Sequence, residues 1–229
     1  MRNIRSAERK AFWDNKILAW ERSRYDRPSL TGWPLKWRRK LFLDAVRPFL
    51  RGWTIVDAGC GSGHLLEELF SMGIKKYIGC DLSSVAIDQA RARTSRLGLT
   101  LKSDFININL SEPRISLPNA DLCFSLGLLD WLGDSDLSEV LKNLNSPWYL
   151  HSFSEKRFSP MVAIHSCFAK ISYGGECPSY VPAYRSTSEM LSHLKQRHLE
   201  SPKVTRDFRM SFSTFVSHLP DQQLRDENR

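Results

Sequence analysis

Apolar positions follow three patterns along the chain. Before residue 52 they recur at helical spacing, which predicts a helix over Asp14–Arg24, a turn-rich break at Pro28–Pro34 and a second helix over Trp37–Leu50. From Trp53 onward, short runs rich in β-branched and aromatic residues alternate with helical segments. Beyond about residue 155 the pattern becomes a mixture of helix, loop and strand signals. The pattern therefore predicts a helical N-terminal arm, an alternating core and a distinct tail.

The middle of the chain predicts an alternating fold. Five apolar runs read as strands: Trp53–Ala58, Lys76–Asp81, Leu99–Asp104, Ala120–Leu126 and Trp148–Phe153. The predicted helices lie between them: His64–Met72, a helix capped by Ser83 or Ser84 that runs to about Leu97, and Asp136–Leu144. Strands and helices that alternate in this way form βαβ units with a parallel sheet.

The tail predicts an antiparallel edge for this sheet. Its predicted elements are a helix at Met161–Lys170, a loop at Gly174–Pro182, a helix at Ser186–His198, and strands at Lys203–Met210 and Phe212–Leu219. The last two strands have no helix between them, so we expect a hairpin. The predicted fold class is therefore α/β, with a seven-stranded, mostly parallel sheet, helices on both faces and an antiparallel C-terminal edge hairpin.

The composition indicates a globular cytoplasmic protein. Hydrophobic residues make up 41% of the chain and aromatic residues 11%, which is enough to bury a core. The longest nearly apolar stretch, Ala120–Leu132, contains two aspartates and is too short to span a membrane. The N-terminal region shows no apolar core of a signal peptide. Five cysteines without a CxxC pair favour free thiols in a reducing compartment, and we expect no metal site.

Positive charge is concentrated in the arm. The chain of 229 residues has a formal net charge of +8. Residues 1–51 contain 14 lysines and arginines against 5 acidic residues, whereas residues 52–229 carry a net charge of −1. We therefore expect a basic, aromatic arm at 1–51 and a catalytic core at 52–229. The charge of the arm indicates an anionic partner, and a solvated helical face is the alternative.

A glycine-rich loop follows the first strand of the core. The sequence Val-Asp-Ala-Gly-Cys-Gly-Ser-Gly places Asp57 at the end of the predicted strand and Gly59, Gly61 and Gly63 before the predicted helix. Glycines tolerate positive φ and let the backbone pass close to a ligand. An acid at this position repels a pyrophosphate and attracts a cationic amine. The loop therefore predicts a site for a cationic ligand.

This loop resembles the first motif of the class I S-adenosylmethionine-dependent methyltransferases, an acid followed by GxGxG. The resemblance implies a Rossmann-like fold with S-adenosylmethionine as the cofactor. It implies that the loop, here Gly59, Cys60, Gly61 and Gly63, packs against the methionine part of the cofactor. It also implies that Asp57 recognises the amino group of the cofactor.

Later residues extend the resemblance. Asp81 ends the second predicted strand, where the family binds the ribose hydroxyls, and Leu82 would pack on the adenine. Asp104, followed by Phe105, ends the third predicted strand, where the family accepts a hydrogen bond from the adenine amino group. Ser125 lies near the end of the fourth strand, which faces the sulfonium and methyl group. These strand ends fit the rule that open α/β sheets bind ligands beyond the carboxyl ends of their strands.

Several residues are candidates for the chemistry of the acceptor. Asp130 and Trp131 stand where many small-molecule members of the family have a Leu-His or His-His pair. Asp130 is a candidate base, with substrate anchoring or turn capping as alternatives. His151 on the fifth strand is a second candidate base, and a buried structural histidine is the alternative. Further candidates come from the region that usually recognises substrate: His165, Tyr180 and Tyr184.

The motifs that are missing favour a small acceptor. The chain has neither the Asn/Asp-Pro-Pro-aromatic tetrapeptide of nucleic-acid amino methyltransferases nor the Pro-Cys nucleophile of cytosine-C5 enzymes. We therefore expect O-methylation of an anionic small molecule or a sugar or surface glycan. RNA modification, carboxyl O-methylation of a tetrapyrrole-like acid, and cofactor binding without catalysis are the alternatives. The oligomeric state stays open.

The two ends of the chain are expected to cover the acceptor. In this family an N-terminal arm and an insert after the fifth strand, here at about residues 155–185, commonly form the lid. The ends are loosely similar to enzymes that methylate magnesium protoporphyrin, including the element Trp37-Arg38-Arg39, and to bacterial glycan-modifying methyltransferases. We expect Arg38, Arg39 and Tyr184 to contact the substrate, because arginine suits bidentate contacts with acidic groups.

Overall fold

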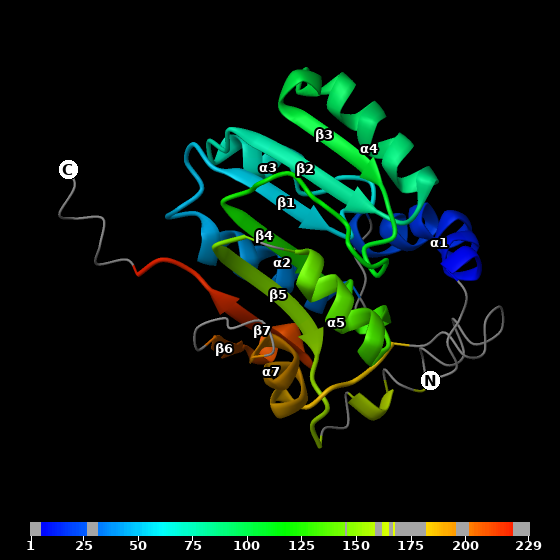
Figure 1. Cartoon of the computed structure of the whole chain (residues 1–229), viewed down its shortest axis with the longest axis vertical. Helices are drawn as coiled ribbons and strands as arrows, with labels where there is room; N and C mark the ends of the chain where they lie inside the picture. Colours follow the sequence, from blue (N-terminus) through cyan, green and yellow to red (C-terminus); the bar gives the residue numbers. More distant parts are fainter. Residues whose placement is uncertain are drawn as a thin grey trace.

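A seven-stranded sheet forms the centre of the computed structural model, which describes residues 6–26, 32–144, 146–158, 162–164, 167, 182–195 and 202–221. The strand order is β3-β2-β1-β4-β5-β7-β6 (Figure 1). The strands are β1 Thr54–Ala58, β2 Lys76–Asp81, β3 Ser103–Asn107, β4 Leu122–Leu126, β5 Trp148–Ser154, β6 Lys203–Arg206 and β7 Ser213–His218. Strands β1 to β5 pair in parallel, and β7 is antiparallel to both β5 and β6. The predicted fold class and the edge hairpin are confirmed.

The order of the sheet reverses at β1. The chain moves outward from β1 through β2 to β3, and then returns to place β4 on the other side of β1. Open α/β sheets bind ligands beyond the carboxyl ends of their strands at such a reversal. The carboxyl ends of β1, β2 and β4 are therefore the first place to look for a site.

Helices cover both faces of the sheet. The α-helices are α1 Ser6–Glu21, α2 Trp33–Val46, α3 Leu66–Ser71, α4 Ser84–Arg96, α5 Asp134–Asn143 and α7 Thr187–Lys195. Short turns of helix are η1 Arg22–Asp26, η2 Thr100–Lys102, η3 Leu129–Trp131 and η4 Phe208–Met210. The predicted cap of α4 is confirmed, because the Ser83 hydroxyl accepts a hydrogen bond from the amide of Ala86 at 3.1 Å.

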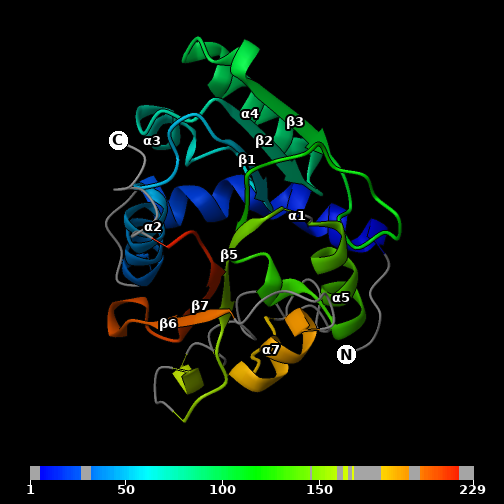
Figure 2. The same cartoon turned by 60° about the vertical axis from the view of Figure 1, so that its left-hand side comes forward.

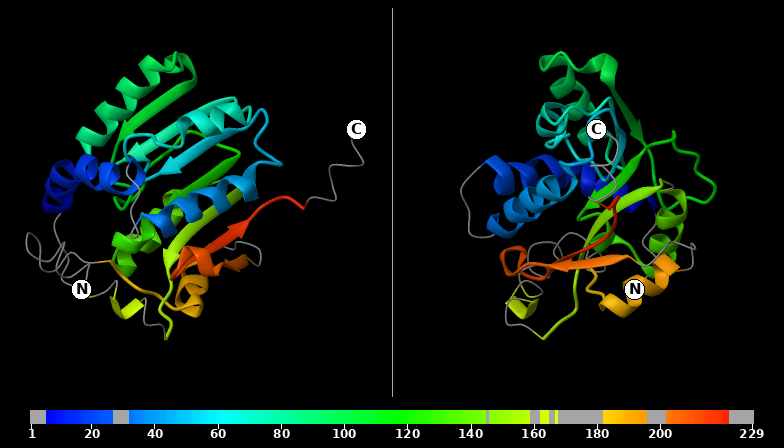
Figure 3. Two further views of the ribbon diagram at one scale, coloured as in Figure 1. Left: turned by 180° about the vertical axis from the view of Figure 1, so that it is seen from behind. Right: turned by 90° about the vertical axis from the view of Figure 1, so that its left-hand side faces the viewer.

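Two hydrophobic cores hold these layers together. The first core joins α2, α3 and α4 to one face of the sheet, through buried residues such as Phe42, Leu66 and Ile87. The second core joins α5 and α7 to the other face, for example through Leu137 and Met190. Figure 2 shows α2 and α5 on opposite sides of the strands, and the rear view in Figure 3 shows α2 lying across the sheet.

The predicted N-terminal arm is built from two helices with different positions. Helix α2 belongs to the core, since Phe42 is fully buried and its ring lies 4.4 Å from that of Phe124 on β4. Helix α1 instead lies at the arrowhead ends of β1, β2 and β3 (Figure 1). Only α1 and the start of α2 therefore stand in the position expected of a lid.

Helix α1 is fixed to the core by polar and aromatic contacts. Arg9 forms an ion pair with Asp136 at 2.7 Å, in the first turn of α5. Asp14 accepts a hydrogen bond from the Ser83 hydroxyl at 2.7 Å, at the start of α4. The rings of Trp13 and Trp131 meet edge-to-face at 4.9 Å. Part of the positive charge of the arm is thus paired within the protein.

The prediction that Asp104 ends the third strand is wrong. Strand β3 begins at Ser103, so Asp104 is its second residue and pairs with Ile78 rather than with the end of β2. The Asp104 carboxylate lies 2.6 Å from the ammonium of Lys76, at the first residue of β2. The apolar alternation of residues 99–104 imitated a strand, but residues 100–102 form η2, in which Leu101 is fully exposed.

Other predictions fall partly outside the described residues. Most of the insert expected at about 155–185 lies outside them, as do His165, Tyr180 and most of the helix expected at Met161–Lys170. Among the described residues, Cys60, Cys80 and Cys123 are buried free thiols and Cys167 is an exposed one. No helix in the described part of the chain combines the length and the hydropathy that crossing a bilayer needs.

Candidate active site

A cavity of about 390 Å³ opens at the carboxyl ends of the strands. One wall comes from the strand ends and includes Gly59, Asp81, Leu82, Gly127 and Leu128. The facing wall comes from the predicted arm: Arg9, Trp13, Ile17, Trp20, Arg24, Pro34, Leu35 and Arg38. The C-terminal part adds a third wall, which includes Met210, Ser211, Phe212 and Ser213. The cavity therefore lies where the reversal of strand order places a ligand site.

The glycine loop lets the backbone form one edge of this cavity. Gly59, Gly61 and Gly63 all have positive φ, at +74°, +53° and +71°. A Cβ at Gly59 would lie only 3.1 Å from the Cβ of Leu128, so a side chain there would close the space between β1 and β4. Gly59 thus lets the backbone line the cavity, whereas Gly61 and Gly63 do not line it.

Asp57 supports the loop from inside the protein. The carboxylate is 4% exposed and accepts a hydrogen bond from the Tyr77 hydroxyl at 2.6 Å. Burial raises the pKa of Asp57 to about 7, and the nearby charges of Asp81 and Glu21 act in the same direction. Asp57 is not among the residues that line the cavity. Its contact with the amino group of a cofactor therefore stays a prediction.

Asp81 joins the end of β2 to the glycine loop. Its two carboxylate oxygens accept hydrogen bonds from the amides of Gly61 at 2.9 Å and Ser83 at 2.8 Å. Burial raises the pKa of Asp81 to about 6, and its hydrogen bonds with backbone amides oppose that rise. Asp81 and Leu82 both line the cavity, as a ribose and adenine site requires.

Asn107 stands at the end of β3, where Asp104 was expected. It pairs with Asp81 across the sheet, and its side-chain amide donates to the carbonyls of Asp81 at 3.0 Å and Leu82 at 2.8 Å. The following residues Ile108 and Asn109 line the cavity. Asn107 was missed because the strand was placed three residues too early. The run Ile106-Asn107-Ile108 carried the apolar alternation that could have located it.

Cys60 and Phe105 lie behind the loop rather than in the cavity. Cys60 is 8% exposed, and its thiol donates to the carbonyl of Gly61 at 3.4 Å. Burial raises the pKa of the Cys60 thiol well above its usual range, so the thiol stays protonated. The ring of Phe105 lies 5.8 Å from that of Tyr77 in the core. We therefore assign both residues to the support of the loop.

Ser125 and His151 pair with each other inside the sheet. Ser125 is fully buried and His151 is 2% exposed, and the Ser125 hydroxyl lies 3.0 Å from Nδ1 of His151. His151 occupies the middle of β5 and stacks on Tyr149. Neither residue is among those lining the cavity, so the expected position of His151 at the pocket mouth is wrong. The residues after Ser125, from Leu126 to Leu128, take the place beside the cavity.

Asp130 is the predicted catalytic residue that does line the cavity. Its carboxylate accepts a hydrogen bond from the amide of Ser154 at 2.6 Å. Burial raises the pKa of Asp130 to about 6, and the positive charges of Arg38 and Arg185 oppose that rise. The side chain of Arg38 is 4% exposed and donates to the carbonyl of Leu126 at 3.3 Å. Arg38 therefore places a positive charge between the end of β4 and Asp130.

The other two predicted substrate contacts have different positions. Arg39 does not line the cavity; its guanidinium pairs with Glu68 and donates to the carbonyl of His64, so its contact with substrate stays a prediction. Tyr184 lies behind the lining, with its ring 5.8 Å from that of Phe212. Burial and the charge of Asp130 raise the pKa of Tyr184 to about 12.

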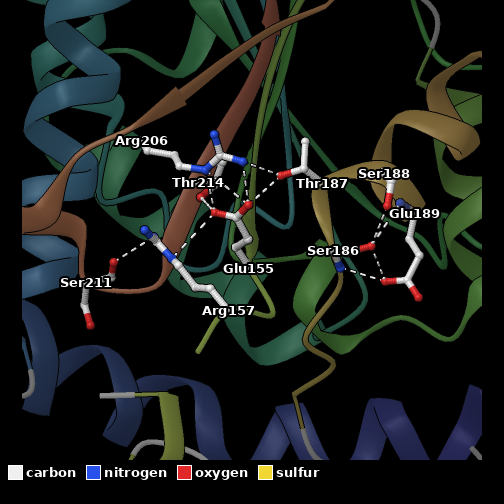
Figure 4. Close-up of polar contacts among 9 residues, drawn as sticks. All are labelled: Glu155, Arg157, Ser186, Thr187, Ser188, Glu189, Arg206, Ser211 and Thr214. Carbon is white, nitrogen blue, oxygen red and sulfur yellow. Dashed lines mark hydrogen bonds and ion pairs between the residues drawn. The ribbon is translucent and has the colours of Figure 1, made fainter. Parts of the chain in front are cut away.

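Ser211 is a lining residue that the sequence did not indicate. Its φ is +59° and its ψ is −113°, an unusual conformation for a residue with a side chain. The Arg157 guanidinium donates to its carbonyl at 2.8 Å and lies beside Glu155, which in turn binds Arg206 (Figure 4). The buried hydroxyl of Ser211 has no hydrogen-bond partner among the described residues. Arginine and carboxylate side chains thus fix the strained backbone from behind.

Glu21 is a third missed residue, at the end of α1. It is 5% exposed, and one of its oxygens accepts a hydrogen bond from the amide of Ser62 at 2.9 Å. In the sequence it is one acid in a strongly basic segment, and no motif marks it. Its contact with the glycine loop depends on the path of the chain between α1 and α2, which apolar periodicity does not reveal.

Known proteins match the segment that holds this site. Residues 55–146 match the family model described as a methyltransferase domain. The ribosomal protein L11 methyltransferase of Tolumonas auensis is 32% identical over 105 residues, which cover 46% of this chain and 34% of that protein. A tRNA U34 carboxymethyltransferase of Haemophilus influenzae is 30% identical over 97 residues, which cover 41% and 30%. The match therefore spans about a third of the length of these curated relatives.

Solved structures extend the likeness to the whole fold. The magnesium protoporphyrin IX methyltransferase of Synechocystis, with S-adenosylhomocysteine bound, has a TM-score of 0.69 at 17% identity, over 93% of this chain and 98% of that one. Human N-acetylserotonin methyltransferase, in complex with S-adenosylmethionine, has a TM-score of 0.58 at 16% identity, over 82% and 53%. Residues 55–146 of this chain therefore match a methyltransferase domain, and the chain shares the fold of these solved methyltransferases.

Proposed function

We propose that the protein transfers the methyl group of S-adenosylmethionine to an oxygen of a small anionic acceptor. The observation that carries this proposal is the continuous cavity between α1 and the strand ends. One end of the cavity has the features of the cofactor site: the backbone at Gly59, the carboxylate of Asp81, and Leu82. The predicted arm forms the wall that faces these residues, and the C-terminal part contributes the remaining lining. A cofactor and a small acceptor would therefore share one cavity, which would hold the reacting groups together.

The part of the lining that we assign to the acceptor combines aromatic rings and positive charge. Trp13, Trp20 and Trp131 line the cavity together with Arg24 and Arg38. Tryptophan rings pack against planar or sugar rings, and arginine pairs with carboxylate and phosphate groups. This lining supports a ring-containing acceptor with an acidic group. Both a sugar of a surface glycan and a tetrapyrrole-like acid belong to this class.

Asp130 is the proposed general base. The bound cofactor supplies an electrophilic methyl group, and an acceptor hydroxyl attacks it most readily while losing its proton. The pKa of Asp130, raised to about 6 by burial, leaves the carboxylate ionised at neutral pH and able to take that proton. We expect Asp130→Asn to lower kcat by about 100-fold with an unchanged dissociation constant for S-adenosylmethionine. A variant with unchanged kcat would remove this role and leave substrate anchoring.

RNA is the second candidate acceptor. Two observations favour RNA. The chain is similar in sequence to tRNA U34 carboxymethyltransferases, and its predicted arm has a net positive charge. The cavity lies between α1 and the strand ends, so a nucleotide within RNA would have to enter beside α1, and this favours the small molecule. Binding of RNA would fall steeply with added salt.

The test is methyl transfer from labelled S-adenosylmethionine to three separate acceptor pools. The first pool contains small molecules from a cell extract, supplemented with porphyrin acids. The second contains purified surface glycans, and the third contains mixed RNA. We expect label in the small-molecule or glycan pool, and none with the Asp81→Ala variant. Label in RNA alone would overturn the choice of acceptor. Binding of the cofactor without transfer to any pool would favour a cofactor-binding protein that lacks catalysis.

A further inference from the structure

The carboxylate of Glu21 is built into the glycine loop. One oxygen accepts the Ser62 amide at 2.9 Å, and the other lies 3.4 Å from Nε2 of His64. A Cβ at Gly61 would collide with the first oxygen, so the absence of a side chain at Gly61 makes room for the carboxylate. Glycine at this position therefore serves a contact with α1, in addition to its positive φ.

Glu21 adds a third carboxylate to those of the core. Burial is the main cause of the raised pKa values of Asp57 and Asp81, and the negative charge of Glu21 contributes to both. The field of Glu21 thus reaches the two acids beside which a cofactor would bind. Two arginines donate hydrogen bonds to backbone carbonyls of the loop. Arg93 donates to the carbonyl of Ser62 at 3.0 Å, and Arg39 donates to that of His64 at 2.7 Å.

Glu21 acts on the cavity from behind its lining. Its neighbour on the same helix face, Ile17, lines the cavity, whereas Glu21 itself does not. Its side chain is 7% exposed, so water screens its charge only weakly. The carboxylate of Glu21 therefore acts on a ligand in the cavity through the net charge of that ligand. It does not form a direct hydrogen bond with the ligand.

We propose that Glu21 makes the cofactor site prefer the cationic S-adenosylmethionine over the neutral product S-adenosylhomocysteine. The proposal rests on the proposed function. At neutral pH, the sulfonium, ammonium and carboxylate give the cofactor one net positive charge, and loss of the methyl group leaves the product with none. The two molecules share their other groups, so a nearby carboxylate separates their affinities chiefly through this charge. The arm thereby assists the exchange of spent for fresh cofactor.

The test compares two ligands on one neutral variant. Glu21→Gln removes the charge and keeps an oxygen that can accept the Ser62 amide. Calorimetry at pH 8 and low salt gives the dissociation constants of both ligands. We expect the preference for S-adenosylmethionine over S-adenosylhomocysteine to fall by roughly fivefold in the variant. Glu67→Gln, an exposed acid on α3, is the matched control and should leave the preference unchanged.

Three results separate the possible failures. An equal loss of affinity for both ligands would make Glu21 a structural support of the loop and overturn the proposal, as would an unchanged preference. Glu21→Ala, which removes both the charge and the hydrogen bond, serves as a second neutral variant, and each variant is checked by thermal unfolding. Failure of the wild-type protein to bind either ligand would instead contradict the proposed function.

Discussion

Asp57 is a buried carboxylate whose proton is held more tightly in the folded chain than in the unfolded one. Burial raises the pKa of Asp57 to about 7, and the Tyr77 hydroxyl donates a hydrogen bond to its carboxylate. In the unfolded chain an aspartate has a pKa of about 3.9. Between these two values the folded protein retains a proton that the unfolded chain has released. Asp57 therefore costs stability as the pH rises from about 4 to about 7.

The substitution Asp57→Asn is expected to stabilise the apoprotein at pH 8. The amide carries no charge and can still accept the hydrogen bond from Tyr77. The difference in free energy of unfolding between variant and wild type should be small at pH 4.5 and grow to as much as about 4 kcal/mol at pH 8. Urea unfolding at several pH values measures it, with the exposed Asp88→Asn as control. A variant less stable than wild type at pH 8 would contradict the account of Asp57.

Ser211 lines the cavity and has a backbone conformation that lowers the stability of the protein. Its backbone has a φ of +59°, which glycine adopts without strain and serine does not. We expect Ser211→Gly to raise the free energy of unfolding by about 1 kcal/mol. Ser211→Ala keeps the strain and should change stability by less than about 0.5 kcal/mol. Equal effects of the two variants on thermal unfolding would show that the backbone at residue 211 is not strained.

At the scale of elements, the sequence predicted most of the fold. The alternation of helices and strands predicted parallel strand pairing. The two consecutive strands after residue 202 predicted the antiparallel edge of the sheet. The third strand was misplaced because Leu99 and Leu101 alternate with polar residues, although their segment forms η2 on the surface. Alternation alone does not distinguish a strand from a short exposed turn. Pairing with β2 supplies the missing information, and it is a tertiary property.

The register of β3 leads to a prediction about two polar residues. Asn107 holds the carbonyls of Asp81 and Leu82, whereas Asp104 pairs with Lys76 away from the cavity. We expect Asn107→Ala to weaken the binding of S-adenosylmethionine about tenfold, through the loss of two hydrogen bonds. Asp104→Ala should leave the affinity unchanged. The opposite pattern in calorimetry would restore Asp104 to the adenine site.

At the scale of the whole molecule, charge alone was a poor guide to the site. The net charge of +9 in residues 1–51 indicated an anionic partner, but several of those side chains pair with acids of the protein itself, including Arg9 with Asp136 and Arg39 with Glu68. Of the ten residues predicted to bind the cofactor, Gly59, Asp81 and Leu82 line the cavity and the other seven do not. Their contacts with a cofactor stay a prediction. The acceptor end depends on the path of α1 across the strand ends. That path is set by long-range contacts with α4, η3 and α5, which no local pattern encodes.

In the proposed function, S-adenosylmethionine binds at the carboxyl ends of the strands, through Asp81. Titration calorimetry of the cofactor with the wild-type protein and with Asp81→Ala tests it most directly, with thermal unfolding to check that the variant folds. We predict one molecule bound per chain in the wild type. We expect an affinity at least about tenfold lower in the variant, because Asp81 joins the end of β2 to the glycine loop. No binding to the wild type, or equal affinity in both proteins, would contradict the claim.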